Sequence, residues 1–351
     1  MSTNRPVLRV AVIGAGVAGA ACAASLQRAG LRVSLFDKSR GIGGRMASRR
    51  AHWTDANGAE QAAEFDHGAQ HFSAHHPRFR ALMARAQAVG CVAHWQPRVH
   101  SVWPGLCEIS SFVPTPNMPA FCRHLLAGVP LYLGQAVQRL QRGADGWYVA
   151  RAEGTSEGPF DQVMLAMPPA QAAVLLAGHH DAWADALAAV RMQPCWTLMA
   201  VTDDVDWPWD AAEPAKGPLA WVARNDRKPG RVAPKGCATW VAQAGTAWSA
   251  AHLEDDPQAV TEALCSALQA QLLTGPALAW HHRSVHRWRY AVPAAHTVDA
   301  RECWWDASLG LGVCGDFFGA GDVEAAWRSG DELADTVEAC LEDVPDMAEA
   351  A

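Results

Sequence analysis

A glycine-rich run near the N-terminus constrains the fold of this chain more than any other feature. Gly14-Ala15-Gly16-Val17-Ala18-Gly19 follows a β-rich stretch (residues 8–13) and opens a helical stretch (residues 17–29) that Gly30 ends. Here the first glycine allows a tight turn, the second lets backbone approach a pyrophosphate, and the third lets helix and strand pack closely. Asp37 closes the next predicted strand, at the spacing of an acidic residue that accepts ribose hydroxyls. The sequence therefore predicts a βαβ unit that binds a dinucleotide at a helix N-terminus.

A second glycine-rich loop follows Asp37. Gly41-Ile42-Gly43-Gly44 can bring more backbone close to a diphosphate, and Arg45 can pair with that diphosphate through two guanidinium N–H groups. A domain that binds only NAD has no need of this second loop. The loop therefore favours FAD over NAD, and the competing interpretation is a basic, solvated loop.

The C-terminal part repeats the opening pattern. A predicted strand (residues 311–314) leads into Gly315-Asp316, a glycine-containing loop and a helix over residues 323–341. Because a helix N-terminus stabilises anions, this end of the chain suits the negative charge of a reduced flavin. Asp322 would oppose that charge, unless it is simply the N-cap of the helix.

The order of predicted elements indicates the domain organisation. Both chain ends supply βα units, whereas strands dominate the middle, interrupted by a helix over residues 257–272. Parallel strands need crossover helices, and only the ends supply them clearly. We therefore expect an α/β chain in which a Rossmann-type FAD-binding domain carries an inserted α+β substrate domain on a mostly antiparallel sheet. The expected boundaries are 1–75, 113–175 and 305–345 for the FAD-binding domain, and 76–112 and 176–304 for the substrate domain.

Composition excludes several classes of protein. The net charge of -7 lacks the basic excess of a nucleic-acid binder. Ten cysteines without a C-x-x-C motif predict free thiols and a cytoplasmic location. The apolar run over residues 10–26 could pass for a signal peptide, but the glycine motif explains it better, and no other stretch suggests a membrane span. The histidine clusters at residues 71–76 and 281–286 lack the partners of a defined metal site, so we expect no metal.

Several segments together resemble the bacterial renalases, which are FAD-dependent oxidases. They occur in the order typical of that family over nearly the whole chain. These segments are residues 36–46, Asp66-His67-Gly68-Ala69-Gln70-His71-Phe72, residues 221–225, His286-Arg287-Trp288-Arg289-Tyr290-Ala291 and residues 313–316.

The resemblance implies an activity and its partners. Renalase-like enzymes oxidise the 2- and 6-dihydro isomers of NAD(P)H; hydride passes to flavin N5, and O2 regenerates the flavin and yields hydrogen peroxide and NAD(P)+. The protein then mainly orients the nicotinamide ring, so no catalytic side chain is assigned. The expected cofactor is non-covalent FAD, because Cys314 lies on a core strand. The expected partners are a small dinucleotide and O2, with no nucleic acid and no membrane.

The resemblance also implies site residues. Those expected to bind FAD are Gly14, Ala15, Gly16, Ala18, Gly19, Asp37, Lys38, Gly44, Arg45, Met46, His67, Gly68, Ala69, Gln70, Val137, Gly315, Asp316, Asp322 and Val323. Those expected to bind substrate are His71, Arg224, Gln243, His286 and Trp288. Two residues depart from the family pattern: His71 replaces an expected Tyr, and Gln243 replaces an expected His.

The sequence leaves two alternative functions open. The chain could be an amine oxidase or another FAD-dependent oxidoreductase with the same fold, although Arg224, Arg287 and Arg289 suit a phosphorylated dinucleotide better. It could also be a flavin-bearing sensor without enzymatic activity. The 16 tryptophans predict an aromatic-lined cavity in residues 190–310, or core packing alone.

Overall fold

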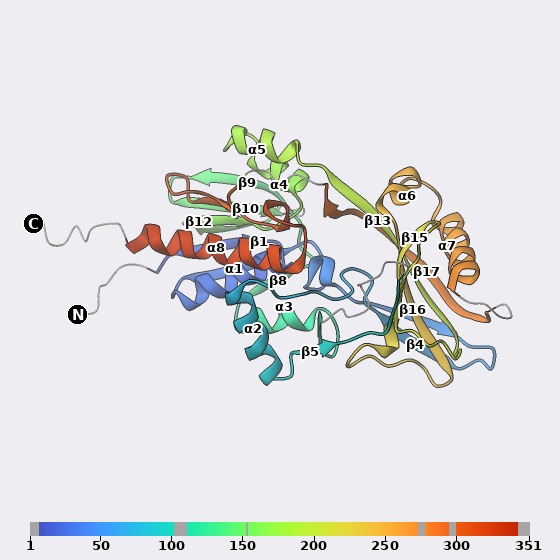
Figure 1. Ribbon diagram of the computed structural model, residues 1–351. Helices are drawn as coiled ribbons and strands as arrows, with labels where there is room; N and C mark the ends of the chain where they lie inside the picture. The colour runs from blue at the N-terminus through green and yellow to red at the C-terminus, as the bar shows by residue number, and fades with distance from the viewer. Residues whose placement is uncertain (1–6, 102–110, 152–153, 273–277, 295–299, 343–351) are drawn as a thin grey trace, which may run out of the picture. The chain divides into compact units, whose positions relative to one another are not determined.

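The computed structural model describes residues 7–101, 111–151, 154–272, 278–294 and 300–342 (Figure 1). The chain divides into two compact units, each described here by itself. Unit 1 consists of Met1–Gly44, Cys122–Arg191 and Pro293–Ala351, and unit 2 of Arg45–Phe121 and Met192–Val292.

Unit 1 is built on a six-stranded sheet in the order β18-β19-β12-β1-β2-β8. Its neighbouring strands run parallel except for the antiparallel pair β18–β19. Every residue of β12 and β19 is buried, as expected for central strands covered on both faces. The strands are β1 (Arg9–Ile13), β2 (Arg32–Asp37), β8 (Leu131–Leu133), β12 (Gln162–Leu165), β18 (Trp304–Asp306) and β19 (Leu311–Val313).

Two long helices of unit 1, α1 (Val17–Arg28) and α8 (Val323–Glu342), lie side by side (Figure 1). They approach so closely that a Cβ on Gly330 would lie 2.0 Å from the carbonyl oxygen of Ala18. A separate antiparallel sheet turns at residues 143–146. The remaining elements are β9 (Val137–Gly143), β10 (Gly146–Arg151), β11 (Ser156–Phe160), α4 (Pro169–Leu176), α5 (Asp181–Ala188) and the 3-10 turn η3 (Asp316–Phe318).

Unit 2 is built on a second six-stranded sheet, in the order β17-β13-β16-β15-β14-β6. The pairs β13–β16, β15–β16 and β14–β15 are antiparallel, and β6 joins β14 in parallel. Helices α6 (Thr246–Ala251) and α7 (Pro257–Leu272) pack on it over a core that includes Trp196 and Trp240. The strands are β6 (Val99–Ser101), β13 (Met192–Asp203), β14 (Ala211–Glu213), β15 (Leu219–Arg224), β16 (Cys237–Ala244) and β17 (Trp280–Pro293).

Smaller elements complete unit 2. A hairpin and a strand pair flank the segment that carries the candidate site, and α3 straddles the boundary between the units. These elements are η1 (Gly44–Met46), β3 (Arg49–Thr54), β4 (Glu60–Phe65), α2 (Pro77–Ala88), β5 (Val92–Trp95), β7 (Ser111–Pro114), α3 (Ala120–Leu125) and η2 (Asn225–Arg227).

The predicted fold class is confirmed: a Rossmann-type α/β sheet is combined with a largely antiparallel one. The compact units divide the chain differently from the expected domains, since residues 45–75 and 113–121 belong to unit 2, and 176–191 and 293–304 to unit 1. The division into compact units does not show which residues bind the cofactor. The boundaries of the FAD-binding and substrate domains therefore stay a prediction. Part of the stretch predicted as strands over 92–112, residues 102–110, lies outside the described residues. Among the helices that the structure describes, none is long and apolar enough to cross a bilayer.

Candidate functional site

The first glycine loop of unit 1 has the geometry of a phosphate-binding turn. Gly14 has φ +118°, and a Cβ there would lie 2.1 Å from the carbonyl oxygen of Ala166. A Cβ on Gly19 would lie 1.9 Å from the carbonyl oxygen of Gly14. By contrast, a Cβ on Gly16 would meet nothing within 4 Å. Gly14 and Gly19 are therefore required by the fold, whereas Gly16 leaves open space in front of the helix.

The N-terminus of α1 opens onto that space. Gly16 is the N-cap residue, and no side chain caps the helix there. The first-turn amide groups of a helix have no partner within the helix, and together with the helix dipole they favour an anion. Ala15 and Ala18 belong to the same turn, as the sequence predicts for a pyrophosphate site.

Asp37, at the end of β2, braces this loop. Its Oδ2 accepts the backbone N–H of Ala15 at 2.7 Å, and its Oδ1 accepts the N–H of Ser39 at 2.7 Å. Each carboxylate oxygen can accept a second hydrogen bond, so ribose hydroxyls can still bind there. Lys38, next in the chain, extends to the Oε1 of Gln171 at 3.2 Å.

The second glycine loop lies against the first. The N–H of Gly43 donates to the carbonyl of Ala15 at 2.8 Å, and a Cβ on Gly44, which has φ +55°, would lie 3.2 Å from the Cα of Gly16. Two glycine loops therefore meet at one helix N-terminus, an arrangement that fits a diphosphate. Arg45 and the buried Met46 begin unit 2, where Arg45 donates to the carbonyl of Ala291 at 3.0 Å.

The C-terminal motif of unit 1 is buried. The N–H of Gly315 donates to Ser329 Oγ at 2.9 Å, and Asp316 is 3% exposed. Asp322 caps α8, because its Oδ1 accepts the N–H of Ala325 at 2.7 Å. Val323 is the first residue of that helix, and Val137 begins β9 with its side chain packed on the core of the unit. Cys314 is fully buried, as expected for a core strand.

In unit 2, side chains from distant strands hold the backbone of residues 66–70. Trp288 donates its indole N–H to the carbonyl of His67 at 2.9 Å, and Gln243 donates its amide to the carbonyl of Gly68 at 2.7 Å. Gln70 also donates to the carbonyl of Gly68, at 3.0 Å, and the N–H of Ala69 donates to the carbonyl of Arg45. The structure thus brings together the residues that the sequence predicts at 67–70 with Gln243 and Trp288.

Aromatic rings gather on this segment in two groups. His67 contacts His286 and Trp288 at ring-centroid distances of 4.7 and 4.9 Å, and we call these three residues the histidine–tryptophan surface. His71 contacts Trp221 at 5.3 Å and Trp95 at 5.7 Å. Trp221 and Gln243 are cross-strand partners, so the second group continues along β15.

The histidines in these groups are held uncharged at neutral pH. Burial, with contributions from His286 and Arg49, lowers the pKa of His67 to about 3. Burial and Arg49 lower the pKa of His286 to about 4, and burial and Lys228 lower that of His71 to about 4. The region therefore offers planar, neutral rings rather than a general acid or a carboxylate.

A buried ionic cluster lies beside these rings. Lys228 is fully buried, 3.4 Å from Asp66 Oδ2 and 3.0 Å from the Oε1 of Gln70, and Arg231 Nη2 lies 2.8 Å from Asp66 Oδ2. Burial raises the pKa of Asp66, but Lys228 and Arg231 outweigh it and hold that pKa below the usual value. Burial lowers the pKa of Lys228 to about 8 despite Asp66. The cluster therefore fixes the position of Gln70.

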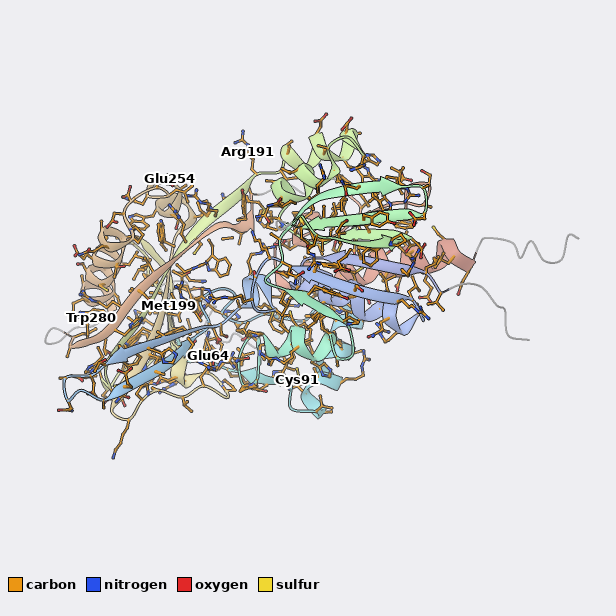
Figure 2. All side chains as sticks on the ribbon, turned by 180° about the vertical axis from the view of Figure 1, so that it is seen from behind. Glu64, Cys91, Arg191, Met199, Glu254 and Trp280 are labelled. Atoms are coloured by element: carbon orange, nitrogen blue, oxygen red, sulfur yellow. The ribbon has the colours of Figure 1, made fainter. Side chains whose placement is uncertain are left out.

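The three arginines expected to serve a phosphorylated substrate have internal partners instead. Arg224 is 2% exposed and pairs with Asp204 at 3.0 Å and Asp226 at 2.8 Å. Arg287 and Arg289 both pair with Glu254, which lies beside the helices of unit 2 (Figure 2). His286 and Trp288, the alternate residues of β17, contact His67 instead.

The sequence reasoning missed several residues of this region. Trp95, Trp221, Lys228 and Arg231 received no role, and neither did Arg49, which contacts His286. The available signal was the Lys-Pro-Gly run over residues 228–230, which follows the 3-10 turn η2. In the described part of the chain, no group of three or more His, Cys, Asp or Glu side chains could hold a metal ion.

Comparisons with known proteins agree with this fold. Residues 12–86 match the family described as NAD(P)-binding Rossmann-like domain. Cyclohexylamine oxidase from Brevibacterium oxydans superimposes with a TM-score of 0.72 at 14% identity, covering 96% of this chain and 100% of that one. The chain has the fold of the amine oxidases. Reduced UDP-galactopyranose mutase also superimposes, with a TM-score of 0.71 at 12% identity over 95% of this chain and 96% of that one, so the fold alone does not fix the reaction.

One relative by sequence is a protein of tRNA modification. The bifunctional protein of tRNA 5-methylaminomethyl-2-thiouridine biosynthesis from Magnetococcus marinus is 30% identical over 201 residues, which cover 46% of this chain. The chain spans only 30% of the length of that relative.

Proposed function

We propose that this chain is an FAD-dependent oxidase of the 2- and 6-dihydro isomers of NAD(P)H, similar to the bacterial renalases. The glycine loops of unit 1 fit the cofactor, because the open space at Gly16 and the second loop at Gly43 and Gly44 suit the diphosphate of FAD. The residues of that unit that would hold FAD are the loop over 14–19, Asp37, and the segments at Gly315 and Val323. For Arg45, Met46 and residues 67–70, FAD binding stays a prediction from the sequence.

Bound FAD accepts the hydride that a dihydropyridine loses, so that one dihydronicotinamide, one proton and one O2 become NAD(P)+ and hydrogen peroxide. The side chains of this chain then have to orient a planar ring and keep water away from it. No side chain has to move a proton from the ring, because a dihydropyridine loses only a hydride.

The observation that carries the proposal is the neutral histidine–tryptophan surface. His67 and His286 remain uncharged at neutral pH, and Trp288 contacts both rings and donates its indole N–H to the carbonyl of His67. Such a surface suits an uncharged, flat dihydropyridine, which aromatic rings bind by stacking. Orientation of this kind contributes strongly to hydride transfer.

Amine oxidation is the second candidate, favoured by the fold that the chain shares with cyclohexylamine oxidase. A protonated amine would meet the positive charge of Arg49 beside His286. We therefore rank amines below dihydronicotinamides.

Steady-state assays separate these functions. The purified flavoprotein is supplied with O2 and with a 2- or 6-dihydro isomer, ordinary NADH, cyclohexylamine or putrescine. We expect hydrogen peroxide and NAD+ in equal amounts from the two isomers alone. Peroxide from an amine only would establish the second candidate, and no turnover of any reductant would favour a flavin-bearing sensor.

A further inference from the structure

Arg49 lies at the edge of the candidate site, beside His286. Its Nη1 lies 3.3 Å from His286 Nδ1, and in the part of the chain that the structure describes it forms no ion pair with a carboxylate. Arg224, Arg231 and Arg287, by contrast, are each paired with an acid. Among the described residues, no carboxylate therefore neutralises the charge of Arg49.

The histidines beside Arg49 carry no positive charge at neutral pH. Burial and then Arg49 lower the pKa values of His286 and His282, and Arg49 contributes to the low pKa of His67. All three rings are therefore neutral at pH 7. The guanidinium of Arg49 supplies the positive charge at the edge of the histidine–tryptophan surface.

The hydrogen bond between Arg49 and His286 fixes which nitrogen of the His286 ring carries the hydrogen. Because an arginine N–H can only donate, His286 Nδ1 is the acceptor, and the hydrogen of the neutral ring lies on Nε2. The guanidinium keeps further N–H groups for a ligand, and Arg49 is exposed, so a ligand can reach it. Planar guanidinium groups bind phosphate through two parallel hydrogen bonds.

We propose that Arg49, oriented by His286, binds a phosphate group of the nucleotide substrate and so selects phosphorylated dihydronicotinamides. The inference rests on the proposed function and extends it, because it names the anionic part of the substrate and its anchor. Arg224, Arg287 and Arg289 do not fill this role, since their guanidinium groups are bound to Asp226 and Glu254.

Adjacent residues of β3 provide a matched pair of variants. Arg50 pairs with Glu64 at 3.6 Å, and neighbouring strand residues point to opposite faces, so R50Q removes the same charge one residue away. Each variant is assayed with the 6-dihydro isomers of NAD and of nicotinamide riboside, which carries no phosphate. We expect R49Q to lower the ratio of the two kcat/KM values, dinucleotide over riboside, by about 10- to 100-fold, the usual effect of losing charged hydrogen bonds. R50Q should leave that ratio as in the wild type.

A binding measurement provides a readout that does not depend on turnover. ADP-ribose is titrated into the flavin-loaded protein and followed by tryptophan fluorescence, and we expect R49Q to weaken its binding by a similar factor, with R50Q unchanged. An unchanged ratio and unchanged ADP-ribose affinity in R49Q would overturn the proposal, as would equal losses in R50Q. If the wild type oxidises no dihydronicotinamide, the proposed function fails, and the ADP-ribose titration still decides the role of Arg49.

Discussion

Trp288 and His67 are joined by a hydrogen bond of 2.9 Å from the indole N–H to the backbone carbonyl, and their rings lie 4.9 Å apart. A strand residue of unit 2 thereby fixes a loop residue 221 positions earlier in the chain. The relationship makes Trp288 both a support of the segment over 66–70 and part of the proposed ring-binding surface.

Trp288→Ala should therefore slow flavin reduction more than it harms folding. Loss of the indole frees the carbonyl of residue 67 and removes the ring contacts with His67 and His286. A ring misplaced by ~1 Å can react ~100-fold more slowly. The rate is measured by stopped flow under nitrogen with a 6-dihydro isomer. Trp280→Ala, at the first residue of β17 and packed on the core that includes Trp196 and Trp240, is the matched control. Equal rates for both variants would leave Trp288 with a packing role only.

Gly16→Val should prevent FAD loading without unfolding the protein. No protein atom lies within 4 Å of a Cβ at Gly16, and its φ of -77° is open to any residue, so the new side chain would clash only with a ligand. Gly19→Ala is the contrasting variant, because its Cβ would meet the carbonyl oxygen of Gly14 at 1.9 Å and disturb the fold itself. The flavin-to-protein absorbance ratio and circular dichroism distinguish the two. A Gly16→Val protein that purifies with full flavin would show that the phosphates bind elsewhere.

These two glycines belong to the part of the fold that is most predictable from the sequence. The spacing of the glycine motif predicted β1, α1 and β2 to within about one residue, since local turn chemistry dominates there. Helix α7 was predicted with the same bounds because Pro257 starts an amphipathic stretch. The hairpin of β3 and β4 was missed, since neither strand has a clear apolar alternation and one face stays polar. Helices α4 and α5 were also missed after Pro168-Pro169.

The candidate site was less predictable, because its contacts are long-range. The alternation of side chains along a strand places His286 and Trp288 on the opposite face of β17 from Arg287 and Arg289. It could not show that the arginine side faces Glu254, which lies 33 residues from Arg287. The burial of Lys228 was equally hidden, since lysine is almost never fully buried unless paired, and its partner Asp66 lies 162 residues away.

Asp66→Asn should destabilise unit 2 more than Lys228→Met does. The first change leaves the buried Lys228 and Arg231 without a carboxylate, which typically costs ~3–5 kcal/mol. After the second change Asp66 keeps Arg231 at 2.8 Å, so the loss should be smaller. The double variant should be more stable than Asp66→Asn alone. Urea denaturation followed by tryptophan fluorescence gives the three free energies of unfolding, and the reverse order of the single variants would contradict the assigned pairing.

Stability should fall as the pH drops below about 6.5, partly because of His67. Its folded pKa of about 3 lies below the ordinary value of 6.5, so the unfolded chain binds a proton that the folded chain refuses. The contribution is present above pH 6.5 and is lost as the pH falls toward 3. At pH 5 the loss amounts to roughly 2 kcal/mol for this one group. Melting temperatures at pH 7.5 and 5.0 should therefore differ less in His67→Phe than in the wild type, and an equal difference would show that His67 is not held neutral by burial.

The central claim is that dihydronicotinamide isomers reduce the bound flavin, and single-turnover mixing tests it most directly. The purified yellow protein is mixed under nitrogen with one equivalent of 6-dihydro-NAD, and the flavin absorbance band is followed together with the formation of NAD+. We predict that the band bleaches within the mixing experiment, with one NAD+ formed per flavin, and that ordinary NADH and putrescine bleach it far more slowly. A flavin that keeps its colour with both the 2- and the 6-dihydro isomer, or that putrescine bleaches faster, would contradict the account.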